Sequence, residues 1–145
     1  MGEVKQRIAM KAVVLDGEGR ILILREAESG YEDGTQGGLW GLMGGRIEPG
    51  ENWLEGLKRE VKEEAGIEID YIKPIYIGEW RPVIQGQETQ IVAVFNLCKI
   101  KSGEVKLSEE HSDYVWMKKS DLAEYRFMDP DDKVIEAAFQ EVSQS

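Results

Sequence analysis

Three glutamates that together could bind a metal ion lie close to one another in the sequence: Glu60, Glu63 and Glu64. In a helix, residues at i, i+3 and i+4 share one face, so the three carboxylates would be neighbours. Such like-charge pairs cost roughly 0.2–0.5 kcal/mol each. A divalent cation would offset this repulsion, because Mg²⁺ takes oxygen ligands and commonly shares its shell with substrate phosphates. On their own, the same residues could equally form a solvated acidic helix face.

The flanking residues predict the helix that would carry these glutamates. Asn52 followed by Glu55 is typical of an N-cap with an acid three residues later. The helix is expected to run from Trp53 to Ala65, with Gly66 as a left-handed C-cap. Apolar residues at spacings of three and four form its expected buried stripe: Leu54, Leu57, Val61 and Ala65.

A glycine-rich segment precedes this helix and is expected to be a loop. Its glycines are Gly37, Gly38, Gly41, Gly44, Gly45 and Gly50. Glycine lets backbone amides and carbonyls come close to a metal ion or a phosphate. Ordinary turn formation is the alternative explanation for such glycines.

The whole segment from Gly45 to Ile67 fits the signature G-x5-E-x7-R-E-U-x-E-E-x-G-U, in which U is a bulky aliphatic residue. The fixed positions are Gly45, Glu51, Arg59, Glu60, Val61, Glu63, Glu64, Gly66 and Ile67. The chain therefore resembles the Nudix hydrolases. This resemblance implies an α/β (α+β) fold, an α/β/α sandwich with a mixed β-sheet. It also implies hydrolysis of a diphosphate bond in a nucleoside diphosphate linked to another group, with Mg²⁺ or Mn²⁺ as cofactor.

The resemblance implies a role for each motif residue. Glu63 and Glu64 are the expected metal ligands, and Glu60 is a further ligand or the base that activates water. The carbonyl of Gly44 is an expected extra ligand. Arg59 is expected to brace the site by pairing with glutamates. Structural roles are implied for the remaining positions: Gly45, Glu51 as a partner of Arg59, Gly66 and Ile67.

A carboxylate outside the motif often completes the site in similar enzymes. Glu110, six residues before Trp116, is the residue we expect in that role, with Glu109 and Asp113 as alternatives. A charged surface loop would explain the same segment. His111 is the single histidine, and because no spacing links it to the helix we expect it to be solvated rather than a base.

The substrate class is less constrained by the sequence. Asp131 and Asp132 resemble adjacent acids that read the base edge in purine nucleoside triphosphate hydrolases of the family, although Asp129 stands where those enzymes have an aromatic residue. A well-capped helix start explains these aspartates equally well. Aromatic residues that could stack on a base are Trp40, Trp80, Phe127 and Tyr31. We expect a standard or oxidised nucleoside triphosphate, cleaved to monophosphate and pyrophosphate.

Two alternatives remain open. Pro82 lies fifteen residues past the motif, where members acting on ADP-ribose have a proline, so ADP-ribose or another nucleoside diphosphate sugar is the rival substrate. A nucleotide-binding regulatory domain without turnover is the alternative of another class. Such domains usually lack carboxylates of the signature, and this chain lacks none.

Length and charge restrict the other possibilities. A chain of 145 residues is expected to form one domain over residues 1–145. Its formal net charge of −10 argues against nucleic-acid polymers and anionic membranes as partners. Cys98 is the single cysteine and is expected to be a buried thiol in a cytoplasmic protein. The family resemblance allows a homodimer, but nothing in the sequence specifies an interface.

Hydrophobic patterns and turn residues predict the other elements. Strands are expected over Arg7–Leu15, Arg20–Arg25, Leu39–Leu42, Ile67–Trp80, Glu88–Ile100 and Tyr114–Met117. The first two should form a hairpin, and the strand from Glu88 should be central because both of its faces are apolar. Pro74 should mark an edge, bulge or break. Ser120 should cap a short helical piece over Asp121–Tyr125, and Asp129 should cap a final helix with Pro130 at its first position.

Overall fold

The computed structural model describes residues 3–27 and 38–143 of the chain. Its strands are β1 (Lys5–Leu15), β2 (Ile21–Glu26), β3 (Trp40–Gly41), β4 (Met43–Arg46), β5 (Glu68–Trp80), β6 (Val83–Ile84), β7 (Gln87–Ser102) and β8 (His111–Met117). Its helices are α1 (Trp53–Ala65), the 3-10 helix η2 (Lys119–Glu124) and α2 (Asp131–Ser143). None of the helices in the described ranges is long and apolar enough to cross a membrane.

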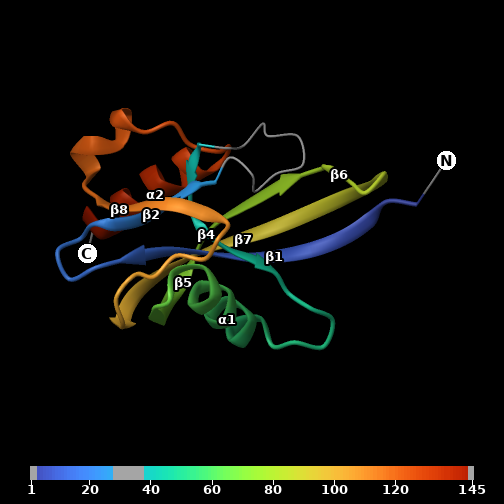
Figure 1. Ribbon diagram of the computed structural model, residues 1–145, viewed down its shortest axis with the longest axis horizontal. Helices are drawn as coiled ribbons and strands as arrows, with labels where there is room; N and C mark the ends of the chain where they lie inside the picture. The colour runs from blue at the N-terminus through green and yellow to red at the C-terminus, as the bar shows by residue number, and fades with distance from the viewer. Residues whose placement is uncertain (1–2, 28–37, 144–145) are drawn as a thin grey trace.

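A mixed sheet lies between the two α-helices (Figure 1). Its main path runs β3-β2-β1-β7-β5, while β4 pairs with β1 and β8 pairs with β2. β1 and β7 are parallel over their whole paired length, and the other pairs are antiparallel. The expected α/β/α sandwich with a mixed sheet is therefore confirmed.

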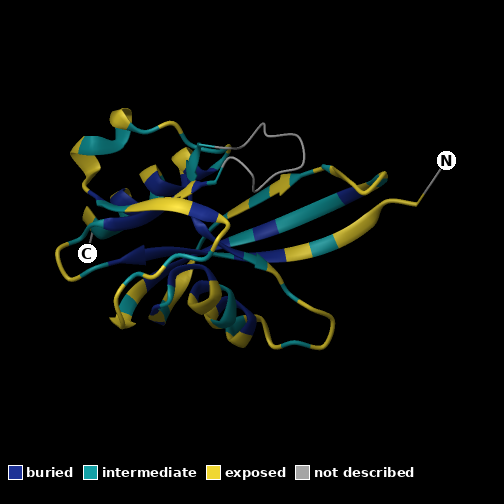
Figure 2. Ribbon diagram, in the orientation of Figure 1, coloured by how far each residue is buried: buried dark blue, intermediate teal, exposed yellow. Residues whose placement is uncertain are grey.

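Each face of the sheet has its own apolar core, because side chains alternate between the faces of a strand. On the α1 side, the buried residues include Met10, Ala12, Val14, Leu22, Leu24, Met43, Leu57, Val61, Ala65, Ile67, Ile69 and Cys98. On the α2 side, they include Ala9, Val13, Ile21, Ile23, Leu42, Ala93, Phe95, Val134, Ile135, Ala138 and Phe139. Figure 2 shows these buried segments in the middle of the sheet and in the inward faces of both helices. Full burial of one such large side chain contributes roughly 1.5–3 kcal/mol.

Several expectations about the strands are confirmed. β7 lies between β1 and β5, so it is central as its apolar faces predict. β5 is at the end of the main strand order, and its register with β7 shifts next to Pro74. The turn before β7 has positive φ at Gln85 and Gly86, as a tight hairpin turn requires. β6 and the first halves of β1 and β7 form an arm that extends away from the helices (Figure 1).

Two expectations about the first half of the chain were wrong. β1 and β2 pair only at Leu15 and Ile21, beside their turn, and then diverge, so they do not form a full hairpin. Residues 43–46 are not loop but strand β4, which pairs with β1 over Ala9–Ala12. Both differences have one cause, because β4 occupies the edge of β1 that a hairpin would have given to β2.

The start of each C-terminal helix also differs from the expectation. The 3-10 helix η2 begins at Lys119, so Ser120 lies inside it and does not cap it. α2 begins at Asp131, and the carbonyl of Pro130 accepts a hydrogen bond from the Val134 N–H. Pro130 therefore precedes the first helical residue, and Asp129 lies one residue too early to be the cap.

Candidate active site

Helix α1 forms where its capping residues predict. Asn52 Oδ1 accepts hydrogen bonds from the N–H groups of Leu54 and Glu55 at 3.0 and 3.1 Å. These bonds satisfy two of the amide groups that a helix start leaves unpaired. Gly66 ends the helix with φ of 72°, and its N–H donates to the carbonyl of Lys62. The expected bounds, Trp53 to Ala65, are confirmed.

The three glutamates of α1 have different environments. Glu64 is buried, and its Oε2 accepts a hydrogen bond of 3.2 Å from the N–H of Gly44. Glu60 has a side chain that is 18% exposed, whereas the side chain of Glu63 is 59% exposed. The three carboxylates on one turn of α1 therefore differ in exposure: Glu63 is in solvent, Glu60 is mostly buried, and Glu64 is buried against the backbone of β4.

Arg59 connects these glutamates to the loop before the helix. Its guanidinium contacts the carboxylate of Glu51 through two hydrogen bonds of 2.8 and 3.1 Å. Its Nη1 also lies 3.1 Å from Glu60 and 3.3 Å from Glu63. The hydrogen bond from Arg59 lowers the pKa of Glu51. Arg59 thus pairs with Glu51 and Glu60, as the family resemblance implies.

Two glycines of β4 make room for this cluster. Gly44 has φ of 132°, and a Cβ on it would lie 2.2 Å from the Met10 carbonyl oxygen, so the strand pairing requires glycine here. A Cβ on Gly45 would lie 2.7 Å from the carboxylate of Glu60. The small size of Gly45 therefore lets the Glu60 carboxylate lie directly against the backbone of β4.

Burial raises the pKa of the two inner glutamates. The pKa of Glu64 is raised to about 7, although the charge of Lys11 and the hydrogen bond from Gly44 oppose the shift. The pKa of Glu60 is raised, again mainly by burial, with Arg59 acting against it. A divalent cation would stabilise the ionised form of both groups. Partly buried carboxylates at a backbone cradle are the oxygen donors that Mg²⁺ and Mn²⁺ take, so the residues fit the implied metal.

The carboxylates of the described residues are not arranged as a preformed metal-coordination site. Within residues 3–27 and 38–143, no three acidic, histidine or cysteine side chains converge as metal ligands would. The reason lies in their present partners, since Glu63 contacts Arg59 and Glu64 contacts Gly44. Metal binding would have to exchange the Arg59–Glu63 contact for a bond to the cation.

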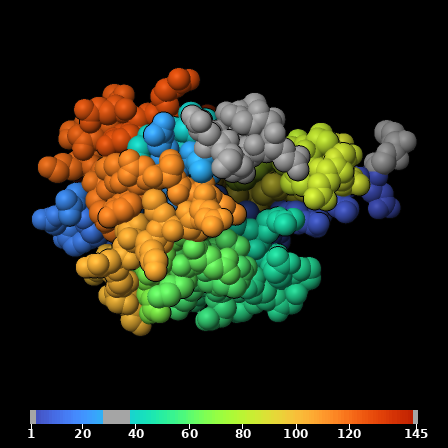
Figure 3. All heavy atoms as spheres, in the orientation of Figure 1, coloured from blue at the N-terminus to red at the C-terminus, as the bar shows by residue number. Residues whose placement is uncertain are grey.

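The segment between β7 and β8 lies against the C-terminal half of α1 (Figure 3). The N–H of Ser108 donates to the carbonyl of Glu64, and the N–H of Ala27 donates to the carbonyl of Glu110. Glu110 itself is exposed, and its charge acts on Glu60 and His111. The structure therefore brings Glu110 to the glutamate cluster. Two alternatives are exposed in the same region: Glu109 and Asp113.

The expectation of a solvated His111 was wrong. Its side chain is 5% exposed, and its Nε2 lies 3.3 Å from Oε1 of Glu26, whose side chain is 10% exposed. Burial lowers the pKa of His111, but the hydrogen bond and charge of Glu26 outweigh burial, so the net pKa is raised. β2 and β8 pair with a register shift that places His111 beside Glu26, which no spacing along the sequence reveals.

Asp131 binds the backbone just before β4, two residues ahead of the Gly44 N–H that binds Glu64. It is 4% exposed, and its Oδ2 accepts a hydrogen bond of 2.9 Å from the N–H of Leu42. A Cβ on Gly41 would lie 2.8 Å from the same oxygen, so Gly41 makes room for it. Burial raises the pKa of Asp131, while Lys11 and the bond from Leu42 act against the shift. Asp132, by contrast, is exposed.

Two of the aromatic candidates lie beside Asp131. Trp40 and Phe127 form an isolated β-bridge, and the ring of Trp40 packs edge-on against Tyr125 at 5.2 Å between centroids. Trp80 comes from the far end of β5 and packs against the α2-side core. All three are half-buried. Tyr31 and Gly37 lie outside the described residues.

Sequence reasoning missed three residues near this site. Lys11 is a charged residue inside the otherwise apolar second half of β1, from Ile8 to Leu15, which is a usable signal because lysine is rarely buried without a function or partner. Gly41 interrupts a strand, which often marks a close approach of other atoms. Glu26 carried no signal, because its burial depends on the pairing of β2 with β8.

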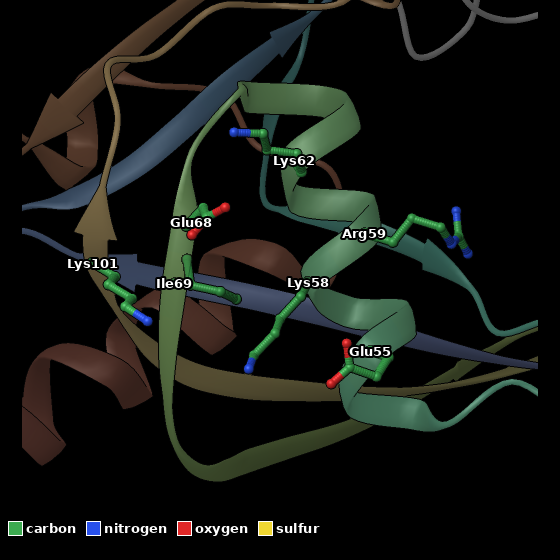
Figure 4. A pocket seen from close by; sticks show the side chains of 7 residues that line it. All are labelled: Glu55, Lys58, Arg59, Lys62, Glu68, Ile69 and Lys101. Atoms are coloured by element: carbon green, nitrogen blue, oxygen red, sulfur yellow. The ribbon is translucent and has the colours of Figure 1, made fainter.

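A groove on the surface of the described residues lies elsewhere (Figure 4). It has a volume of about 310 Å³ and runs between α1 and the strands β5 and β7. It is lined by Glu55, Lys58, Arg59, Lys62, Glu68, Ile69 and Lys101. Of these, only Arg59 belongs to the glutamate cluster. We place the candidate site at the carboxylates of α1 that face β4, because Glu60 and Glu64 are partly or fully buried there, whereas four of the seven groove residues are basic.

Comparison with known protein sequences agrees with this geometry. The model of the NUDIX domain matches residues 5–138. The nucleoside triphosphatase NudI from Escherichia coli O1:K1 is 31% identical over 119 residues, which make up 77% of this chain and 82% of NudI.

Solved structures agree as well. The MutT protein from Methanosarcina mazei Go1 is 24% identical, with a TM-score of 0.71 and coverage of 100% of both chains. An ADP-ribose pyrophosphatase from Streptococcus suis is 21% identical, with a TM-score of 0.65, covering 96% of this chain and 92% of its own. These two likenesses concern the fold alone. With the matched domain model, the NudI relative and the complete motif on α1, the chain belongs to the NUDIX domain family and is a Nudix pyrophosphohydrolase.

Proposed function

We propose that this enzyme hydrolyses a nucleoside triphosphate to the monophosphate and pyrophosphate, with Mg²⁺ or Mn²⁺ as cofactor. One observation carries the proposal. The N–H groups of Leu42 and Gly44 hold the buried carboxylates of Asp131 and Glu64, respectively. These donors are two residues apart, about 7 Å along a strand. One short segment therefore holds both the carboxylate that would read the base and a carboxylate that would bind the metal at the phosphates.

Glu60, Glu63 and Glu64 would hold the cation, together with the carbonyl of Gly44. When bound, the cation would neutralise phosphate charge and acidify the attacking water. Glu60 is suited to accept a proton from that water, because burial raises its pKa and its carboxylate lies against Gly45. The oxygen of water then bonds to phosphorus, and the bond between phosphorus and the bridging oxygen breaks. Glu110 would complete the site from the segment before β8.

Base recognition would use Asp131, with Trp40 and Phe127 as the stacking surface beside it. A buried carboxyl that is hydrogen-bonded by Leu42 has a second oxygen for a donor on the base edge. Asp132 would contribute from the rim, and Trp80 from the end of β5. NudI, a relative described as a nucleoside triphosphatase, favours this substrate class over the others.

The test measures phosphate and pyrophosphate release with Mg²⁺ over a panel of standard and oxidised nucleoside triphosphates, ADP-ribose, other nucleoside diphosphate sugars and diadenosine polyphosphates. Glu60→Gln and Glu63→Gln should each reduce turnover at least about 100-fold, since each removes a metal or proton-transfer group. Pyrophosphate from a triphosphate, lost in both variants, is the expected result. Near-normal rates in both variants would overturn the assigned roles.

The panel also separates the alternatives. Turnover confined to ADP-ribose or a sugar nucleotide would transfer recognition to the segment around Pro82, which precedes β6 and whose carbonyl accepts from the Thr89 N–H. Binding of nucleotide and metal without turnover of any compound would favour a regulatory domain. Either result would contradict the proposed triphosphate substrate.

A further inference from the structure

Three carboxylates in or near the site are buried in a chain whose formal net charge is already −10. Glu26, Glu64 and Asp131 are 8%, 9% and 4% exposed. Buried charges are costly unless they are paired. Glu26 is paired with His111. The other two carboxylates receive one backbone N–H each, from Gly44 and Leu42, and so carry charge that these neutral donors do not cancel.

Lys11 supplies the positive charge that acts on both of these carboxylates. Burial raises the pKa of Glu64 and of Asp131, and the charge of Lys11 is the largest influence opposing burial in each case. Lys11 lies on β1 directly opposite Gly44, the residue that binds Glu64. Its side chain is on the α2 side of the sheet, because it alternates with Met10 and Ala12 of the α1-side core.

Among the described residues, the ammonium of Lys11 forms no ion pair with Glu64 or Asp131. No acidic group of residues 3–27 and 38–143 lies within 4.0 Å of it as an ion-pair partner. Lys11 is nevertheless half-buried. A half-buried ammonium whose charge acts on two carboxylates, without an ion-pair contact to either, keeps donors available for a third group.

We infer that Lys11 is a substrate-binding residue whose ammonium contacts the α-phosphate of the bound nucleotide. The inference rests on the proposed function, in which the phosphates lie at Glu64 and the base lies at Asp131. A nucleotide spanning these two carboxylates would lie within the field of Lys11, whose charge acts on both, and the α-phosphate is the anionic group nearest the nucleoside. Lysine is a compact point charge that commonly binds phosphate. A cation bound at Glu64 would balance the negative charge of that carboxylate, so Lys11 would be free to contact a phosphate.

A purely structural role makes a different prediction. If Lys11 only balances Glu64 and Asp131, its removal should weaken every ligand of the site alike and should alter the protein without ligand. If it contacts the α-phosphate, its removal should weaken ligands that have this phosphate and spare those that lack it. A nucleoside and its 5′-monophosphate differ by that group alone.

The experiment compares wild-type protein with Lys11→Met, Lys11→Arg and, as a matched control, Lys5→Met. Lys5 is an exposed lysine of the same strand, so its removal changes the net charge equally. Ligand-observed NMR titration without added metal gives the affinity for the monophosphate released from the best substrate and for its nucleoside. Thermal unfolding verifies that each variant is folded.

Lys11→Met should weaken the monophosphate about tenfold or more and leave the nucleoside unchanged, in keeping with a charge-assisted hydrogen bond. Lys11→Arg should recover part of the loss, and Lys5→Met should show none. Equal losses for both ligands, or no loss for either, would overturn the contact. The measurement can be made whichever nucleotide is hydrolysed, because ADP-ribose hydrolysis also yields a nucleoside monophosphate. If nothing is hydrolysed, AMP, GMP, CMP and UMP serve as probes.

Discussion

Glu63 and Glu64 are neighbours in the sequence, yet only Glu64 is buried. We therefore expect the two carboxylates to differ in how readily they move and how readily they ionise. Glu63 is exposed and contacts Arg59, so it can turn toward a cation at little cost. Glu64 is fixed by the N–H of Gly44, and burial raises its pKa to about 7. A carboxyl with that pKa is partly protonated near neutral pH, and metal binding must release the proton. Metal affinity should therefore rise with pH through about 7.

The raised pKa of Glu64 should also make the stability of the metal-free protein depend on pH. Because the folded pKa of Glu64 lies above the ordinary glutamate value of 4.5, its contribution to stability is complete below pH 4.5 and is lost as pH rises through about 7. Glu64→Gln removes this loss and should raise the free energy of unfolding at pH 8 by about 1–3 kcal/mol, with a much smaller gain at pH 4. Denaturant unfolding at both pH values, with EDTA present, measures the effect.

Glu63→Gln is the control, because its exposed side chain should leave the pH dependence of unfolding unchanged. An equal effect of Glu64→Gln at pH 4 and pH 8 would contradict a raised pKa for Glu64. Turnover should fall in Glu64→Gln whatever happens to stability, since a proposed metal ligand is lost.

At the scale of elements, α1 could be predicted completely because its signals are local. Asn52, Gly66 and the apolar stripe all lie within or next to the helix, and the structure has the same bounds. β4 could not be predicted, because its pairing depends on glycines packed against the distant β1. The burial of His111 depends likewise on the register of β2 with β8. The helix that carries the proposed metal ligands was therefore predictable from the sequence, and the Glu26–His111 pair was not.

The two glycines of β4 should respond differently to the same substitution. Gly45→Ala places a Cβ against the carboxylate of Glu60, the far end of a side chain that can move, so turnover should fall at least about tenfold with little change in stability. Gly44→Ala meets backbone atoms of Met10 and Lys11 at a φ that favours glycine, so it should cost roughly 2 kcal/mol or more. Kinetics and thermal unfolding of both variants check this.

Gly17→Ala is a suitable control, since a Cβ there meets nothing within 4 Å. It should preserve both turnover and stability. If Gly45→Ala lost stability as severely as Gly44→Ala, the substitution would be damaging the sheet, and the argument that Gly45 positions Glu60 would be wrong.

At the scale of the whole molecule, buried carboxylates lie where the proposed cation would bind. The sheet and the two helices bury carboxylates on both sides of β4, and the metal-free protein bears their desolvation and repulsion. A ligand that binds only the folded state stabilises it by mass action. A divalent cation should therefore act as a structural ligand of the entire fold as well as a cofactor of the reaction.

Removal and return of metal should shift the melting temperature of the protein. With Mn²⁺ at about 100 times its dissociation constant, the gain is about 2.7 kcal/mol, which for a domain of this size is about 5–10 °C relative to EDTA. Glu64→Gln should abolish most of the shift. Glu55→Gln, an exposed glutamate on the same helix but outside the cluster, should retain it. Scanning calorimetry at pH 8 gives the measurement. A shift of the same size in Glu64→Gln would show that Mn²⁺ stabilises the protein through other groups, and the assignment of the cation to α1 would then fail.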